Sequence, residues 1–170
     1  MMTTEIDEVL KADLFTSQIY QGTFALDTLP KLRPSGLYIM NLDVSTESGS
    51  HWTLIKVHKE NAIVTYFDSL GRPPPIEIIP QLTKEKNIVK YADVAVQSSL
   101  SQACGYHVLF VAFLLARGSN LKEILLDIYY ALERQYLRND FLSMEVISTL
   151  TKLRKRPIID WENFFPKEKK

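Results

Sequence analysis

Four side chains in this sequence can together hydrolyse an amide bond: His51, Asp68, Gln97 and Cys104. Acyl transfer by a thiol needs a thiolate, an imidazole that carries a proton to the leaving amine, and an acid that orients the imidazole. It also needs hydrogen-bond donors for the oxyanion, which the Gln97 amide and the backbone N–H of Cys104 can provide. The four residues therefore cover the roles that thiol-dependent hydrolysis requires.

Each of these residues also has an interpretation without chemistry. Cys104 stands between two small residues and can be a packing residue, because free cysteine is among the most buried residue types. His51 can close a loop, Asp68 can form a turn, and Gln97 can be a polar group at a strand edge. Their arrangement favours the catalytic interpretation, because each stands at the predicted end of a strand or helix, and such ends can converge if the strands share one sheet.

The nucleophile candidate is placed by a long apolar segment, residues 103–116, in which only His107 is polar. A helix without a polar face is predicted to be buried. At about 1.5 Å per residue it spans roughly 21 Å, which is too short to cross a bilayer. Gly118 and Arg117 are suited to end it. Cys104 lies at the opposite end, where the helix dipole and free N–H groups lower the pKa of a thiol.

Strands are predicted from runs rich in β-branched and aromatic residues. They cover residues 36–42, 52–57, 63–67 and 88–96. The polar residues 59–61 join the second and third strands in a hairpin that Asp68 closes, and Gln97 ends the fourth strand. Residues 20–34 are interrupted by glycine and proline and are predicted to be irregular chain.

The remaining elements are predicted helices that flank this core. The first is capped by Thr3 or Thr4, ends near Leu14 and has an apolar face of Ile6, Val9, Leu10 and Phe15. A short helix follows over 76–84. A capping box of Asn120 with Glu123 begins a helix that ends near residue 136, and another helix covers about 139–154. Residues 156–170 are predicted to be a docked aromatic tail with a basic tip.

These elements predict the α+β class: a small mixed β-sheet packed around a buried central helix that carries the cysteine at its N-terminus. A chain of 170 residues is expected to form a single domain. Within it we expect an N-terminal lid helix in 1–19, a catalytic core in 20–118, and C-terminal helices with the basic tail in 119–170.

Composition limits the partners and the compartment. A single cysteine excludes an intrachain disulfide and any cysteine-rich zinc site, and three scattered histidines lack metal-ligand spacing, so we expect no metal and no cofactor. Twenty basic and twenty acidic residues cancel, so no overall field attracts nucleic acid or an anionic membrane. The N-terminus has early acidic residues and no apolar run, which predicts an intracellular protein without a membrane anchor.

Three further features have competing interpretations. The basic runs 152–156 and 167–170 can contact phosphates, which keeps DNA as an alternative partner, but such runs are usually solvated. His107 follows Cys104 by three residues on one helix, and its side chain leans toward the preceding turn, so we expect a core or rim histidine rather than the catalytic base. His58 is expected on the strand face opposite His51.

The order of His51–Trp52, Asp68, Gln97 and Ala103–Gly105 resembles the cysteine proteases that include the adenovirus maturation protease and, more distantly, the ubiquitin-like-protein proteases. Gln97 and Cys104 are seven residues apart, as in the adenoviral type, whereas the ubiquitin-like branch usually has six. That branch also has Asp where this chain has Ala103. Tyr20–Gly22, Phe24 and Ile39–Asn41 add similarity, and the resemblance covers about residues 20–117.

The resemblance implies a fold of the adenain/Ulp1-like type and a role for each matching residue. Cys104 would be the nucleophile, His51 the general base and acid, Asp68 the orienting acid, and Gln97 an oxyanion donor.

Two neighbouring residues would bind substrate by the same resemblance. Trp52 would wall the site and shield the ion pair from water, although ordinary strand packing explains it equally well. Gly105 would let the substrate backbone approach the thiol, because it has no side chain.

The resemblance also implies cleavage of viral precursor proteins, in the capsid or core, after small residues such as glycine during virion maturation. The enzyme would then act in the virion and at the assembly site in the host cytoplasm or nucleus. Three departures qualify this: Asp68 replaces the usual adenoviral Glu, the segment between Asp68 and Gln97 is short, and the chain lacks a second cysteine for covalent activation by a peptide. Any peptide activator would bind non-covalently. The alternatives are a protease for ubiquitin-like proteins and a non-catalytic capsid-associated scaffold with the same fold.

Overall fold

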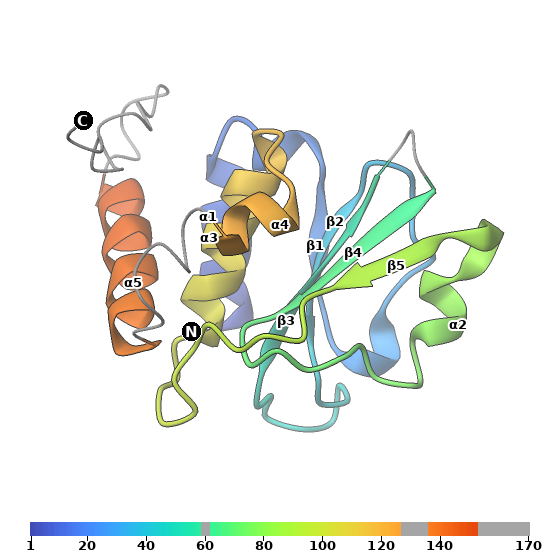
Figure 1. Ribbon diagram of the computed structural model, residues 1–170, viewed down its shortest axis with the longest axis horizontal. Coiled ribbons are helices and arrows are strands. Elements are labelled where there is room, and N and C mark those ends of the chain that lie inside the picture. The colour runs from blue at the N-terminus through green and yellow to red at the C-terminus, as the bar shows by residue number, and fades with distance from the viewer. Residues whose placement is uncertain (59–61, 127–135, 153–170) are drawn as a thin grey trace.

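The computed structural model describes residues 1–58, 62–126 and 136–152 (Figure 1). The predicted turn at 59–61, the end of the helix predicted to reach residue 136, the aromatic tail and nearly all of the two basic runs lie outside these ranges. The α+β prediction is confirmed: one mixed five-stranded sheet is covered by helices.

The sheet has the strand order β1-β2-β3-β4-β5. Its central strands are β2 (Leu37–Asn41), β3 (Trp52–Val57) and β4 (Ile63–Asp68), which pair antiparallel, so the predicted hairpin is present. Two edge strands, β1 (Tyr20–Phe24) and β5 (Ile88–Tyr91), pair parallel to their neighbours.

Both edge strands differ from the sequence-based expectation. Residues 20–24 were expected to be irregular, but they form β1, because pairing with β2 outweighs a glycine at φ 136° and a register shift between Tyr20 and Gly22. Glycine disfavours a strand only weakly, and tertiary pairing can override it. The strand predicted over 88–96 ends at Tyr91, so Gln97 does not end a strand. It lies in the loop that follows.

The central helix α3 (Cys104–Ala116) begins and ends as predicted, and eleven of its thirteen residues are buried. Together with α1 (Thr3–Ala12) it lies on one side of the sheet, and α2 (Ile79–Leu82) lies on the other (Figure 1). The sheet residues that face α3 include Ile39, Leu54 and Phe67. Alternate strand residues, including Met40, Ile55 and Tyr66, form a second core on the α2 side.

The ends of α1 and α3 are joined by a partly buried ion pair. Arg117, just beyond α3, donates from Nη2 to Asp13 Oδ1 at 2.6 Å, and its guanidinium lies 4.5 Å from the ring centre of Phe15. Ile6, Val9 and Leu10 are buried as predicted, but Phe15 lies beyond α1 and is half exposed. The expected Thr cap is also wrong: Met2 caps α1, and its N–H donates to Glu5 Oε2 at 2.6 Å.

Beyond α3, Gly118 has the left-handed conformation (φ 97°) that favours glycine. The capping box at α4 (Leu121–Glu123) is present: Asn120 Oδ1 accepts from the Glu123 N–H at 3.0 Å, and Glu123 Oε2 accepts from the Asn120 N–H at 2.9 Å. Helix α5 (Tyr136–Lys152) begins three residues before the expected position and packs on the outer side of α3 (Figure 1).

Short 3₁₀ turns cover Thr16–Gln18, Leu26–Thr28 and Lys84–Lys86. The helix predicted over 76–84 shortens to one α-helical turn and the last of these turns. Among the described residues, each helix is either too short or too polar to span a lipid bilayer.

Candidate active site

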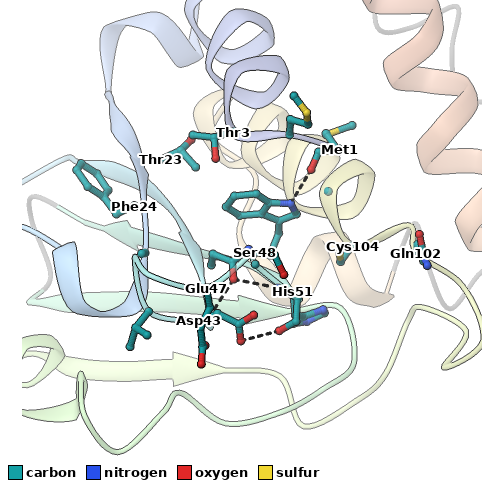
Figure 2. A pocket seen from close by; sticks show the side chains of 18 of the residues that line it. Met1, Thr3, Thr23, Phe24, Asp43, Glu47, Ser48, His51, Gln102 and Cys104 are labelled. Carbon is teal, nitrogen blue, oxygen red and sulfur yellow. Dashed lines mark hydrogen bonds between the residues drawn. The ribbon is translucent and has the colours of Figure 1, made fainter.

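Cys104 is the first residue of α3 and opens onto a cleft of about 1010 Å³. The same cleft is lined by His51, Trp52, Gln97 and Gly105, so the fold brings the predicted site residues together. Figure 2 shows Cys104 and His51 toward one end of the cleft and Phe24 toward the other. The thiol is only 8% exposed, which restricts access to a ligand that enters the cleft.

The hairpin brings His51 to Asp68. Thr53 of β3 pairs with Asp68 at the end of β4, so a residue just before β3 lies beside that end. The His51 Nε2 lies 2.7 Å from Asp68 Oδ1, and both residues are buried. Because Nε2 is engaged by the carboxylate, Nδ1 is the ring nitrogen that remains for the thiol.

Asp68 is held rigidly in this position. Its Oδ1 also accepts the backbone N–H of Leu70 at 2.8 Å. Its other oxygen, Oδ2, is buried and has no hydrogen-bond partner among the residues that the structure describes. A buried carboxylate with an incomplete set of donors favours a cationic neighbour, and the His51 imidazole is placed to supply that charge.

The surroundings of His51 favour its protonated form. Burial alone lowers the pKa of the imidazole, because it disfavours the cation. Hydrogen bonding to Asp68 and to Cys104, with Coulombic attraction from both, exceeds that effect and raises the pKa of His51 from 6.5 to about 9. The imidazolium is therefore the main form at neutral pH.

Cys104 shifts in the complementary direction. Burial raises its pKa, but hydrogen bonding to His51, backbone N–H groups of Trp52 and Gly105, and attraction to the imidazolium together lower the pKa below its ordinary value of 9.0. The raised pKa of His51 and the lowered pKa of Cys104 both favour a thiolate–imidazolium pair. Such a pair supplies the nucleophile and a proton for the leaving group at the same time.

Gln97 reaches the cleft from a loop rather than from a strand end. Its backbone N–H donates to the Ser69 carbonyl at 2.9 Å, its Oε1 accepts the Ser69 hydroxyl at 2.6 Å, and its Nε2 donates to the Ser101 carbonyl at 2.9 Å. These bonds orient the amide so that Nε2 is its donor end. One N–H of Nε2 remains available to a ligand, because an amide NH₂ has two donors.

The N-terminal residue covers the floor of the cleft beside Cys104. The Trp52 Nε1 donates to the Met1 carbonyl at 3.1 Å. A Cβ atom added at Gly105 would lie 2.8 Å from Met1 Sδ, so the Met1 side chain fills the space above this glycine. The approach of a substrate backbone to Gly105 stays a prediction, and it requires Met1 to move.

The two other histidines lie away from the reactive pair. His107 is fully buried and binds Asp140 Oδ1 through Nε2 at 2.8 Å, as expected for a core histidine. His58 follows β3 and contacts Thr65 Oγ1 through Nε2 at 2.9 Å. In the described part of the chain, no three His, Cys, Asp or Glu side chains are grouped closely enough to hold a metal ion.

The comparisons with known proteins agree with this geometry. The sequence profile of the Ulp1 protease family, C-terminal catalytic domain, matches residues 37–149, which include His51, Asp68, Gln97 and Cys104. The chain belongs to the Ulp1 protease family. Members of this family are cysteine proteases, and the expected adenain/Ulp1-like fold is confirmed. No curated protein sequence matches the chain.

Solved structures add relatives of the fold. The ASFV pS273R protease is 19% identical with a TM-score of 0.55, over 82% of this chain and 65% of that chain. A selenomethionine form of the same protease is 25% identical with a TM-score of 0.42, over 64% and 44%. The SUMO protease Ulp1 is 15% identical with a TM-score of 0.46, over 88% and 78%. This chain thus spans less than two thirds of the ASFV protease chains.

Several residues at this family site were missed in the sequence. Ser69 orients Gln97, Met1 covers Gly105, and Asn139 donates from Nδ2 to the Val96 carbonyl at 3.0 Å. No residue spacing indicates these contacts, because each joins segments that are distant in the sequence and adjacent only in the fold.

Proposed function

We propose that the chain is a cysteine endopeptidase in which Cys104 is the nucleophile, His51 the general acid and base, and Asp68 the residue that orients His51. The observation that carries this proposal is the 2.7 Å contact of His51 with Asp68 beside a thiol whose pKa is lowered. A structural cysteine in a core has no need of a buried imidazolium.

In the proposed reaction, the Cys104 thiolate attacks the carbonyl carbon of the scissile peptide bond. The oxyanion accepts hydrogen bonds from the Cys104 backbone N–H and the free N–H of Gln97 Nε2. The His51 imidazolium then donates its proton to the leaving amine as the C–N bond breaks, which leaves a thioester. Water attacks the thioester, His51 takes the proton from that water, and the acid product departs as the thiolate returns.

For the substrate, we propose viral precursor proteins of the capsid or core, cut after small residues such as glycine during virion maturation. The seven-residue interval between Gln97 and Cys104, with Ala103 before the cysteine, supports the adenoviral type. Trp52 lines the cleft beside the thiol, which supports a small residue at the cut. The enzyme would act in the virion and at the assembly site in the host cytoplasm or nucleus, alone or with a non-covalent peptide activator.

A protease for ubiquitin-like proteins is the second candidate. The match to the Ulp1 protease family favours it, and Asp68 is the acid usual in that branch. Tails of ubiquitin-like proteins end in two glycines and would fit the same cleft. The two candidates therefore share their chemistry and differ in the folded body attached to the scissile segment.

Cleavage of two substrates separates these candidates: a peptide with a Gly-X bond and a conjugate of a ubiquitin-like protein. Maturation protease activity predicts that the free peptide is cut at least as efficiently as the conjugate, measured by kcat/KM. The second candidate predicts a strong preference for the conjugate. Cleavage of neither substrate, with no labelling of Cys104 by a glycine-ended thiol probe, would contradict both candidates and favour the scaffold. Cys104→Ala is the control in each assay.

A further inference from the structure

Two adjacent buried residues near the start of α5 reach the two halves of the proposed catalytic machinery. Asn139 donates from Nδ2 to the carbonyl of Val96, the residue before Gln97, at 3.0 Å. Asp140 binds His107, one turn along α3 from Cys104, at 2.8 Å. Asn139, Asp140 and His107 are each at most 5% exposed, so water does not compete for these contacts.

The Asn139 contact matters because no strand supports Gln97. Strand β5 ends at Tyr91, and the loop after it is tied to the body at Ser69, whose carbonyl accepts the N–H groups of Val96 and Gln97 at 2.8 and 2.9 Å. Ser69 thus fixes the backbone of Val96 and Gln97 through their N–H groups. Asn139 holds the carbonyl of Val96, so the backbone that carries the Gln97 side chain is fixed from both directions.

The Asp140 contact fixes the helix that carries the nucleophile. The faces of α3 are otherwise apolar, and apolar packing alone tolerates small rotations and translations of a helix. A buried hydrogen bond of a carboxylate to an imidazole has one good geometry, and it penalises such shifts. Because His107 is three residues from Cys104, a shift at His107 moves the thiol relative to His51 by a similar distance.

We propose that Asn139 and Asp140 are positioning residues for catalysis, with Asn139 acting through Gln97 and Asp140 acting through the first turn of α3. Helix α5 then belongs to the active centre as well as to the core. This inference rests on the proposed function. A purely structural role would change the stability of the protein but leave the chemistry of the folded fraction unchanged.

Asn139→Asp tests the first half, because it keeps the size of the side chain and, once ionised, has no donor for the Val96 carbonyl. We expect kcat for a Gly-X peptide to fall about tenfold or more with little change in KM, since a displacement of about 1 Å can cost a hundredfold in rate. The rate of Cys104 alkylation by iodoacetamide should not change. In a Gln97→Ala background, Asn139→Asp should have no further effect on kcat, because the Gln97 amide that Asn139 positions is already absent.

Asp140→Asn tests the second half with an equally conservative change. We expect iodoacetamide to alkylate Cys104 several-fold more slowly and kcat to fall with it. Ser143→Ala is the matched control: this buried serine of α5 donates to the Asp140 carbonyl at 3.0 Å, within the same helix. It should change stability only. All variants are assayed at a temperature where thermal unfolding shows each to be folded.

The outcomes separate the inference from the proposed function. If the wild-type protein cuts the peptide while Asn139→Asp keeps its kcat and Asp140→Asn keeps its alkylation rate, the positioning roles are overturned and the proposed function stands. Equal effects of Ser143→Ala would also overturn them, because a change that leaves the Asp140 side chain and its bond to His107 in place would then reproduce the result. If the wild-type protein cuts neither the Gly-X peptide nor the conjugate of a ubiquitin-like protein, the proposed function is overturned, and this inference with it.

Discussion

At the scale of single residues, the chemistry depends on an exchange of protons between two buried groups. The pKa of His51 is raised because Asp68 and Cys104 stabilise its cation, and the pKa of Cys104 is lowered because His51 and two backbone N–H groups stabilise its anion. Burial alone acts against both charged forms, so each shift depends on neighbouring groups: the two residues stabilise each other, Asp68 adds to the shift of His51, and backbone N–H groups add to that of Cys104. The functional unit is therefore the pair rather than the cysteine.

Replacement of Cys104 by alanine or serine should abolish peptide cleavage. The thiol is the proposed nucleophile, and both replacements are close to isosteric at the start of α3, so the thermal unfolding temperature should change little. Turnover of a Gly-X peptide, measured with unfolding of the same samples, checks this. Ser99→Ala, in the exposed loop before α3, is the control that should keep full activity. Measurable cleavage by Cys104→Ala would end the assignment of the nucleophile.

Type, order and spacing are local properties of the chain, and they were sufficient to select four residues that the fold brings together. The reactive roles of these residues stay a prediction. His51 and Cys104 line one cleft, Asp68 contacts His51 at 2.7 Å, and Gln97 joins the cleft from an unexpected element. The supporting residues were beyond prediction. Met1 acts through its carbonyl and side chain, Ser69 through its carbonyl and hydroxyl, and Asn139 through its amide to a backbone carbonyl. Contacts of this kind leave no pattern of residue types.

At the scale of elements, buried helices and hairpins were predicted well and edge strands poorly. Helix α3 has a run of apolar residues that fits only a buried helix. The hairpin has two runs rich in β-forming residues that flank a polar turn. Strand β1 contains a glycine and pairs with β2, the next strand along the chain, only across an intervening loop. Its stability derives from the sheet rather than from its own residues, which is why local propensity gave the wrong result.

Helix α1 should contribute to stability through its apolar face. Leu10 is fully buried against the core that contains α3, whereas Leu14, just beyond α1, is 58% exposed. Leu10→Ala should lower the free energy of unfolding by about 2 to 5 kcal/mol, because it removes buried methyl groups and leaves a cavity. Leu14→Ala should change it by less than about 0.5 kcal/mol. Urea denaturation of both variants measures the difference, and equal losses would contradict the placement of α1.

At the scale of the whole molecule, one sheet separates two cores, and the cleft opens where α3 meets the ends of β3 and β4. Helix α5 covers α3 from outside, so α3 is enclosed between the sheet and other helices (Figure 1). This enclosure leaves Cys104 only 8% exposed, so a thiolate there depends on His51 and backbone N–H groups rather than on water. The sequence indicated the buried helix, but it did not indicate that α5 would share polar contacts with it.

The lone cysteine also predicts how the activity responds to reductants. Covalent activation through a second cysteine of this chain is impossible, and oxidation can only consume the nucleophile. Cleavage of a Gly-X peptide should therefore be kept, or should increase, when dithiothreitol is added. Protein treated with peroxide and then with reductant serves as the control for reversible oxidation. Loss of activity in dithiothreitol alone would show that a disulfide supports the active state, contrary to this account.

The pH dependence of Cys104 alkylation tests the thiolate–imidazolium pair most directly. Alkylation rates for the wild-type protein and for His51→Ala are measured with iodoacetamide across the pH range where both stay folded. Because His51 lowers the thiol pKa, the wild-type rate should rise and level off at a pH below the ordinary thiol value of 9.0. Without the imidazolium, burial raises the pKa, so the rise in His51→Ala should move to higher pH. Coincident profiles for the two proteins would contradict the pair and the mechanism built on it.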